Sequence, residues 1–345
     1  MPRIDSKLSD SQQPTQVSPR GRRGASLDGA LRLALALILG AGASFADSLA
    51  VAQGYNLFAF NNINVSADVG GSVALGGQLQ SATSIGSQLS VSSGFPSLVA
   101  DGTSNSNVIA NGVGTIDVDN GSAYLSGYSS SHPANATFNQ GGAGYMTGSD
   151  PVSGGIAASQ SSFVSLANAL TNTTPNATLS NGIINISGQG AGTYVVNVNN
   201  VSSLTGIYYN AGSQTLIINV TGSTTWSGVN LTINGSQPNN TSTAASTILF
   251  NFGTASAVAL DSGFFGSILA PDATVSGAGT IVNGEVIAND INGLGEVESQ
   301  SIFSGNLPGA GTPEPATLTL MGAALVGFGV FGRRQLWLKA QPIGK

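Results

Sequence analysis

The sequence predicts a mainly β protein: an irregular β-solenoid, similar to a β-helix, with one packed α-helix. Three observations support this fold class. Apolar and polar residues alternate along a series of short segments, Asn-Gly pairs separate these segments, and a single segment instead has the spacing of an amphipathic helix. The repeat length is irregular, so a β-sandwich with one helix is the alternative.

Alternation is clearest in the second half of the chain. Apolar residues at every second position give a strand one apolar face, and this pattern occupies residues 194–198, 216–220 and 229–233, with further segments at 247–252, 266–271 and 279–290. Asn-Gly pairs begin at positions 111, 120, 181, 234, 283 and 292, and this dipeptide favours turns with positive φ. We therefore expect many short strands joined by tight turns, and loops or extra hairpins over 101–155.

Residues 157–171 have a different pattern. Phe163, Leu166, Ala167 and Leu170 recur at the i, i+3, i+4 and i+7 positions of one helix face. This spacing predicts an amphipathic helix of about three turns that covers part of the core.

The start of the chain has the organisation of an export signal. Several arginines precede the uncharged apolar run 33–43, which is too short as a helix to cross a hydrocarbon layer of ~30 Å. Small residues follow it: Ser44 and Ala46 occupy the −3 and −1 positions of one cleavage site, and Ala50 and Ala52 those of another. We assign residues 1–46 to a cleaved export signal with a polar leader.

The far end of the chain predicts a membrane span over residues 316–332. This segment carries no charge, and as a helix it would be ~25 Å long, near the lower limit for crossing a bilayer. Arg333 and Arg334 follow it and would hold the tail on the cytoplasmic side.

Pro313, Glu314 and Pro315, the apolar span, and the pair Arg333-Arg334 occur in this order within residues 312–345. This arrangement resembles the PEP-CTERM sorting signal of Gram-negative bacteria. The resemblance implies that the exported protein is held transiently in the inner membrane. It also implies a partner, an exosortase, which is a membrane cysteine protease that cuts near the Pro-Glu-Pro and directs the product to the cell surface or the exterior.

The region between the two signals has an unusual charge. Residues 44–312 contain no Lys or Arg and twelve Asp or Glu, so their formal charge is 0 − 12 = −12. Such a chain cannot neutralise phosphates, which excludes nucleic acid as a partner and electrostatic docking on anionic lipid. There is no cysteine either, so neither salt bridges nor disulfides hold the body together.

Two blocks at opposite ends of the body carry a second resemblance. Tyr55–Gly77, "YNLFAFNNINVSADVGGSVALGG", and Gly266–Asp290, "GSILAPDATVSGAGTIVNGEVIAND", are similar to the opening and closing halves of the choice-of-anchor A domain. The similarity covers roughly residues 53–303 of a body that we place at 47–311. It implies an exported, non-catalytic surface protein with an adhesive role.

Catalytic groups are scarce. His132 is the single histidine, there is no cysteine nucleophile, and the body has no cation to stabilise an anionic transition state. We therefore predict that the protein is not an enzyme. The alternatives are a secreted polysaccharide hydrolase, with a carboxylate pair from Asp261, Glu285 and Glu296, and an ice-binding or small-ligand-binding module.

Candidate binding residues follow from the adhesive interpretation. Tyr208, Tyr209 and Trp226 offer rings on which the sugars of an exopolysaccharide could stack. Asp117 with Asp119, and Glu296 with Glu298, would each share one side of a strand. These acids are the candidate ligands for Ca²⁺, and we expect no other cofactor. The sequence thus predicts an exported biofilm-matrix or surface protein that associates with polysaccharide.

Overall fold

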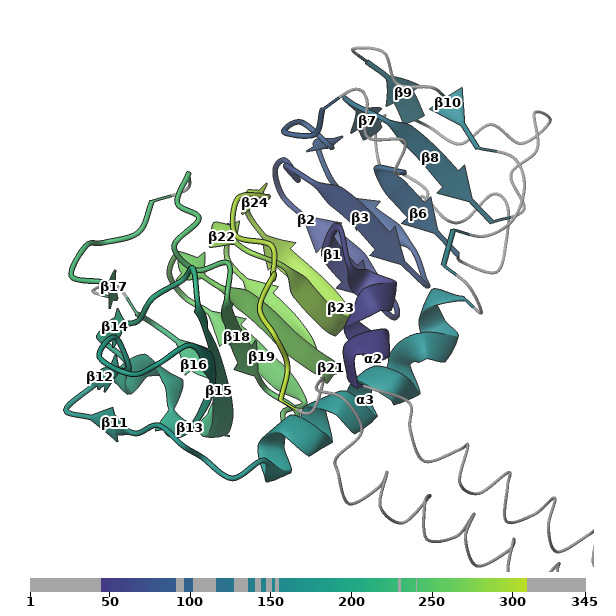
Figure 1. Cartoon of the computed structure of the whole chain (residues 1–345). Helices are drawn as coiled ribbons and strands as arrows, with labels where there is room; N and C mark the ends of the chain where they lie inside the picture. The colour runs from purple at the N-terminus through teal and green to yellow at the C-terminus, as the bar shows by residue number, and fades with distance from the viewer. Residues whose placement is uncertain are drawn as a thin grey trace, which may run out of the picture. The chain divides into compact units, whose positions relative to one another are not determined.

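The computed structural model of the chain describes residues 45–90, 96–101, 116–126, 136–139, 144–146, 151–152, 155–228, 231–239 and 241–308 (Figure 1). The apolar run 33–43 and the predicted span 316–332 lie outside the described residues. Among the residues that are described, no helix is long and apolar enough to cross a membrane.

The largest sheet supplies the side of the solenoid that we call face I. Its strands pair in the order β10-β8-β6-β3-β1-β23-β21-β18-β15-β13, and every pair along this path is parallel. In chain order the strands are β1 (Tyr55–Ala59), β3 (Ser72–Leu75), β6 (Leu98–Ala100), β8 (Ser122–Leu125), β10 (Gly144–Tyr145), β13 (Gly192–Asn200), β15 (Gln214–Ser223), β18 (Ile248–Asn251), β21 (Ser267–Gly277) and β23 (Val286–Leu294).

Two further sides complete each turn of the chain. Face II consists of β2 (Ile63–Val65), β4 (Leu79–Ser81), β16 (Thr225–Trp226), β19 (Ala257–Leu260) and the second halves of β21 and β23. Face III consists of β5 (Ser84–Ile85), β7 (Ile116–Val118), β9 (Ala136–Phe138), β12 (Ile183–Asn185), β14 (Gly206–Tyr208), β17 (Thr232–Ile233), β20 (Phe264–Phe265), β22 (Val282–Asn283) and β24 (Val297–Glu298). The chain passes through faces I, II and III in turn, which confirms the β-solenoid and rules against the β-sandwich.

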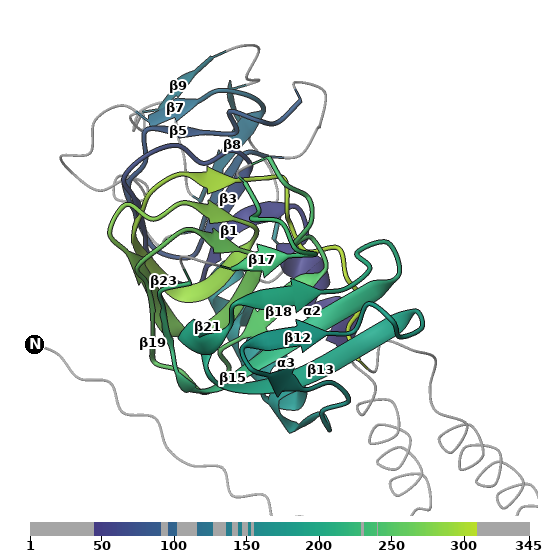
Figure 2. The ribbon, with the colours of Figure 1, turned by 90° about the vertical axis from the view of Figure 1, so that its left-hand side faces the viewer.

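The strand order does not follow the sequence. From β1 the chain builds outward to β10, and helix α3 (Ile156–Asn172) then carries it along face I to the other end of the stack (Figure 1). From β13 the chain builds inward again until β23 pairs with β1. The first and last strands of face I in chain order therefore lie side by side in the middle of the sheet (Figure 2).

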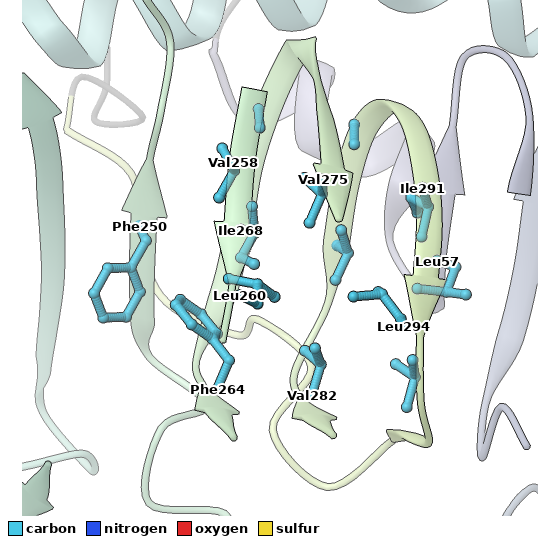
Figure 3. Close-up of a cluster of buried hydrophobic side chains, with 14 of the residues drawn as sticks. Leu57, Phe250, Val258, Leu260, Phe264, Ile268, Val275, Val282, Ile291 and Leu294 are labelled. Atoms are coloured by element: carbon cyan, nitrogen blue, oxygen red, sulfur yellow. The ribbon is translucent and has the colours of Figure 1, made fainter. Parts of the chain in front are cut away.

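Alternate residues of face I point into the solenoid and form one apolar stack across the pairing of β1 with β23. Leu57 pairs with Val286, and the stack continues through Ile268 and Phe250. All four side chains are fully buried. Figure 3 shows that residues of face II, such as Val258 and Val275, point into the same interior.

Helix α3 covers the outer side of face I and confirms the helix predicted at 157–171. Its buried residues are Ile156, Phe163, Leu166, Ala167 and Leu170, so the predicted apolar stripe is the packed one. The helix lies so close to the chain after β18 that only glycine fits at position 253. A Cβ added at Gly253 would lie 2.9 Å from the Cβ of Ala167. Strands of face I that are covered on both sides are buried at every position, as β1 and β3 are.

Two local expectations have different outcomes. The Asn181-Gly182 pair forms the two-residue turn between β11 (Leu179–Ser180) and β12, with positive φ at both residues, as predicted. The expectation of loops or hairpins over 101–155 is wrong for β7, β8, β9 and β10, which are parallel strands of the solenoid. Parallel pairing joins residues of different turns, so local alternation could not reveal it.

Helix α2 (Phe45–Ala52) precedes β1 and packs against α3. Ala52 is fully buried, and Leu49 and Val51 pack against the cluster beneath the helices. This position distinguishes the two candidate cleavage sites, because cutting after Ala52 would remove the whole helix, whereas cutting after Ala46 keeps most of it.

The first prediction is that the exported protein begins at Asp47. N-terminal sequencing of the exported protein measures this directly. A purified body that starts at Gln53 should be less stable than one that starts at Asp47 by roughly 2 kcal/mol or more, because the apolar contacts of α2 are lost. An exported protein that begins at Gln53 would contradict the prediction.

Candidate functional site

The outer side of face II presents a row of small side chains, all polar except one Ala. Parallel register aligns Thr225, Ala259, Ser276, Asn292, Asn64 and Ser81 across neighbouring strands. We call these six residues the face II row; all of them are exposed or half-buried. Their neighbours on the inner side, among them Val258, Val275 and Ile291, are buried, so the row is held by the strands of the solenoid.

The row offers hydrogen-bond donors and acceptors with little charge. The Asn64 amide donates to the Oδ1 of Asn292 at 3.0 Å, which fixes two neighbouring amides relative to each other. Successive strands of a sheet are ~4.8 Å apart, so equivalent groups repeat at that spacing. The nearby carboxylate of Asp290 already accepts bonds from Asn62 and Asn289. The row is therefore suited to a neutral, hydroxyl-rich surface.

The three predicted aromatic residues do not form a surface. Trp226 is fully buried, packs edge-on against Phe250 and Phe264, and donates from Nε1 to the Gly263 carbonyl at 3.0 Å. Tyr209 is also buried, and its hydroxyl donates to the Ala244 carbonyl. Only Tyr208, on β14, is half-buried. This placement removes Trp226 and Tyr209 as stacking platforms for sugars.

The two acid pairs predicted to bind Ca²⁺ both lie on face III but on separate turns. Bridges connect β24 to Val69, Val69 to β5, and β5 to β7, so two turns separate the pairs. Asp117 accepts from the Thr137 hydroxyl, and Asp119 accepts from Asn139 at 3.2 Å. Each residue of this pair already has a partner on the neighbouring strand.

The second pair lies beside Asp68. Burial raises the pKa of Glu296, and the neighbouring charges of Glu298 and Asp68 raise it further. Glu298 is itself buried and accepts from the Gln88 amide. Within the described ranges, no group of three or more Asp, Glu or His side chains is arranged to hold a metal ion. Calcium binding therefore stays a prediction.

Glu285 occupies the corner at which face III passes into face I. It lines a cavity of about 190 Å³ together with Leu49, Ala50 and Gln53 of the α2 region and residues 303–307. Desolvation raises the pKa of the buried Glu285 well above its ordinary value, although a backbone hydrogen bond from Phe303 lowers it in part. Its Oε1 has no hydrogen-bond partner. Glu285 is a catalytic candidate from the sequence because it is an acid, but its burial follows only from the fold.

This placement weighs against a hydrolase that uses Glu285. Glycoside hydrolysis requires two carboxyl groups that face one substrate, and none of the other residues that line the cavity is acidic. Asp261 is exposed on another corner, after β19. The geometry therefore favours binding at a surface over catalysis in this cavity.

Comparison with known protein families decides the relationship. A family model described as "Putative Ice-binding-like adhesive domain" matches residues 48–299, which is most of the chain. The chain belongs to this family of adhesive domains. The model of the PEP-CTERM protein-sorting motif matches residues 312–335. Both matches confirm the expected adhesive body and sorting signal, although neither carries the name choice-of-anchor A.

Two solved structures are similar to this member of the adhesive family at low sequence identity. The ice-binding protein of the Antarctic ascomycete Antarctomyces psychrotrophicus is 12% identical, with a TM-score of 0.31, over 75% of this chain and 98% of that chain. An ice-binding protein from an Arctic yeast is 13% identical, with a TM-score of 0.30, over 76% of this chain and 95% of that chain. No curated protein matches the chain.

The second prediction concerns pH. Because the folded-state pKa values of Glu285 and Glu296 are raised, their contribution to stability is fully present below the unfolded pKa near 4.5 and is lost as the pH rises through the folded values. The melting temperature of the body should therefore fall between pH 5 and pH 8.

Glu285→Gln should raise the melting temperature at pH 8, leave it nearly unchanged at pH 5, and so flatten the profile. Asp261→Asn, which alters an exposed carboxylate, is the matched control and should keep the wild-type slope. Thermal melts of the three proteins across this range measure the effect. Equal slopes for Glu285→Gln and wild type would contradict it.

Proposed function

We propose that the protein is a non-catalytic adhesin that is exported, sorted by an exosortase, and attached to hydroxyl-rich exopolysaccharide through face II. The observation that carries the proposal is the face II row, six aligned positions with no large apolar side chain. The family membership and the sorting motif support the adhesive role and the surface destination.

The chemistry of the row favours a neutral polymer. Hydroxyl and amide groups can both donate and accept, as sugar hydroxyls do. Each such bond contributes only ~1 kcal/mol in water, so a single sugar would bind weakly. A polymer that contacts several strands at once gains from its linked contacts. A row across the turns of a solenoid suits that kind of ligand better than a small molecule.

Ice binding is the second candidate, because the family description and the two solved relatives carry that name. The regular spacing of parallel strands favours it. Against it, the row contains a single Thr, with Ala, two Ser and two Asn at the other positions, rather than repeated Thr. A changed habit of growing ice crystals in the presence of the purified body would support this candidate over the adhesin.

The third prediction tests the face II row. Ser276→Leu adds a bulky apolar side chain without a ring in the middle of the row and should weaken binding to host exopolysaccharide about tenfold, which corresponds to ~1.4 kcal/mol. Ser162→Leu, on the exposed side of α3, should bind like wild type. Binding curves for immobilised polysaccharide measure the effect, and equal loss in both variants would count against face II. Release of reducing ends during the incubation would instead indicate a hydrolase.

The fourth prediction tests sorting. In a host with an exosortase, the mature protein should end close to Pro313-Glu314-Pro315 and lack Trp337. Replacing Pro313 and Glu314 by Ala should leave at least ten times more protein in the inner membrane, on the order expected when a protease loses its recognition sequence. Intact-mass measurement of the surface and membrane fractions decides the outcome. Full-length tails at the surface would contradict sorting.

A further inference from the structure

Residues 299–308 follow β24 and run along the corner between faces III and I; we call them the strap (Figure 1). The strap contains no β-strand. Its hydrogen bonds reach successive turns near the starts of face I strands: Ser304 donates to the Ser246 carbonyl at 2.8 Å, Asn306 donates to the Thr215 hydroxyl at 2.8 Å, and the Thr193 hydroxyl donates to the Asn306 carbonyl at 2.9 Å.

Two apolar residues seat the strap beside α2. Leu307 is buried and Phe303 is partly buried, and both pack against the cluster that contains Phe163. The same segment lines the Glu285 cavity, where one carboxyl oxygen has no partner. The seat thus combines apolar contact with an unsatisfied buried acid, and the strap can leave it without breaking a strand pair.

The docked strap shortens the chain between the body and the sorting motif. Pro313 lies five positions after Pro308, which allows a reach of at most ~18 Å at ~3.6 Å per residue. If the strap left its seat, the free chain would begin after Glu298, fifteen residues before Pro313, and the reach would grow to ~54 Å. The predicted span begins at Ala316, so the cut must occur between the body and the membrane.

We propose that the docked strap restricts exosortase cleavage, and that release of residues 299–308 from the body allows processing. A protease acts on an exposed, extended segment, and a linker of four residues, 309–312, keeps the folded body close to that segment. Cleavage then follows the population of the undocked strap, as proteolysis of a locally opened state does. This inference rests on the proposed sorting function and adds a step that controls it.

The experiment follows conversion of precursor to mature protein by pulse–chase in a host with an exosortase. Phe303→Ala with Leu307→Ala should speed conversion roughly tenfold, because it removes the apolar contacts that hold the strap. Phe303→Leu, which keeps an apolar side chain at the seat, is the matched control and should stay close to wild type. Ten Gly and Ser residues inserted after Pro308 should also speed conversion, although the strap itself is unchanged.

The outcomes separate the two proposals. If the wild-type precursor is never processed, the sorting function fails. If wild type is processed but the insertion does not alter the rate, the strap does not limit cleavage and the inference is overturned. If the insertion speeds conversion but the double Ala variant converts at the wild-type rate, then release of the strap is not the step that allows cleavage, and the inference is overturned. Resistance of each body to a protease that cuts at apolar residues shows that the variants are folded.

Discussion

The pairing of β1 with β23 joins the two ends of the body, and the rest of the solenoid depends on it. Residues 228 apart meet here, and the Asn56 amide donates to the carbonyls of Gly284 and Glu298 at 3.0 and 2.9 Å. Closing a loop of that length costs about 5 kcal/mol in chain entropy, beyond a constant term. The apolar stack through Leu57 and Val286 offsets this cost, because it continues unbroken from one half of the body to the other. Without this pairing, β1 and β23 would each be an unpaired edge strand. Each half of the body therefore covers the edge of the other.

A body without Lys or Arg must satisfy its helix ends and acids with neutral groups. At the carboxyl end of α3, where a basic residue would ordinarily be favourable, the Asn219 amide donates to the Leu170 carbonyl at 2.8 Å and the Asn251 amide to the Ala167 carbonyl at 2.9 Å. At its amino end, the Asp101 carboxylate accepts from the Ile156 amide at 3.2 Å. The two bonds at the carboxyl end join neutral groups and are insensitive to salt. The stability of the body is instead sensitive to pH through buried acids such as Glu285, because no cation offsets the charge that forms when they ionise.

Local patterns in the sequence predicted the helix, the strand alternation and the Asn181-Gly182 turn, because each depends on neighbouring residues. Strand order was not predictable in this way, since the outward and inward halves of the chain meet through long-range pairings: β1 and β2 with β23, and Val69 with β24. The two blocks Tyr55–Gly77 and Gly266–Asp290 did indicate where the two halves meet, because they contain the strands on either side of the β1–β23 pairing. Candidate site residues were less predictable. Trp226 lies in β16 and Tyr209 directly follows β14. Only the course of the turns shows that their side chains are buried and that the two acid pairs lie apart.

The course of each turn also relates the binding face to the tail. The chain passes from face I to face II and then to face III, so the corner between faces III and I lies across the interior from face II. Helix α2 leads into β1 at this corner, and the strap runs along it past the starts of β13, β15 and β18. Both ends of the body therefore leave from the side opposite the face II row. Under the proposed function, a body held by its tail exposes that row rather than covering it, so adhesion does not have to wait for the tail to be cut. Cleavage near Pro313 then determines where the protein resides, while the solenoid alone determines what it binds.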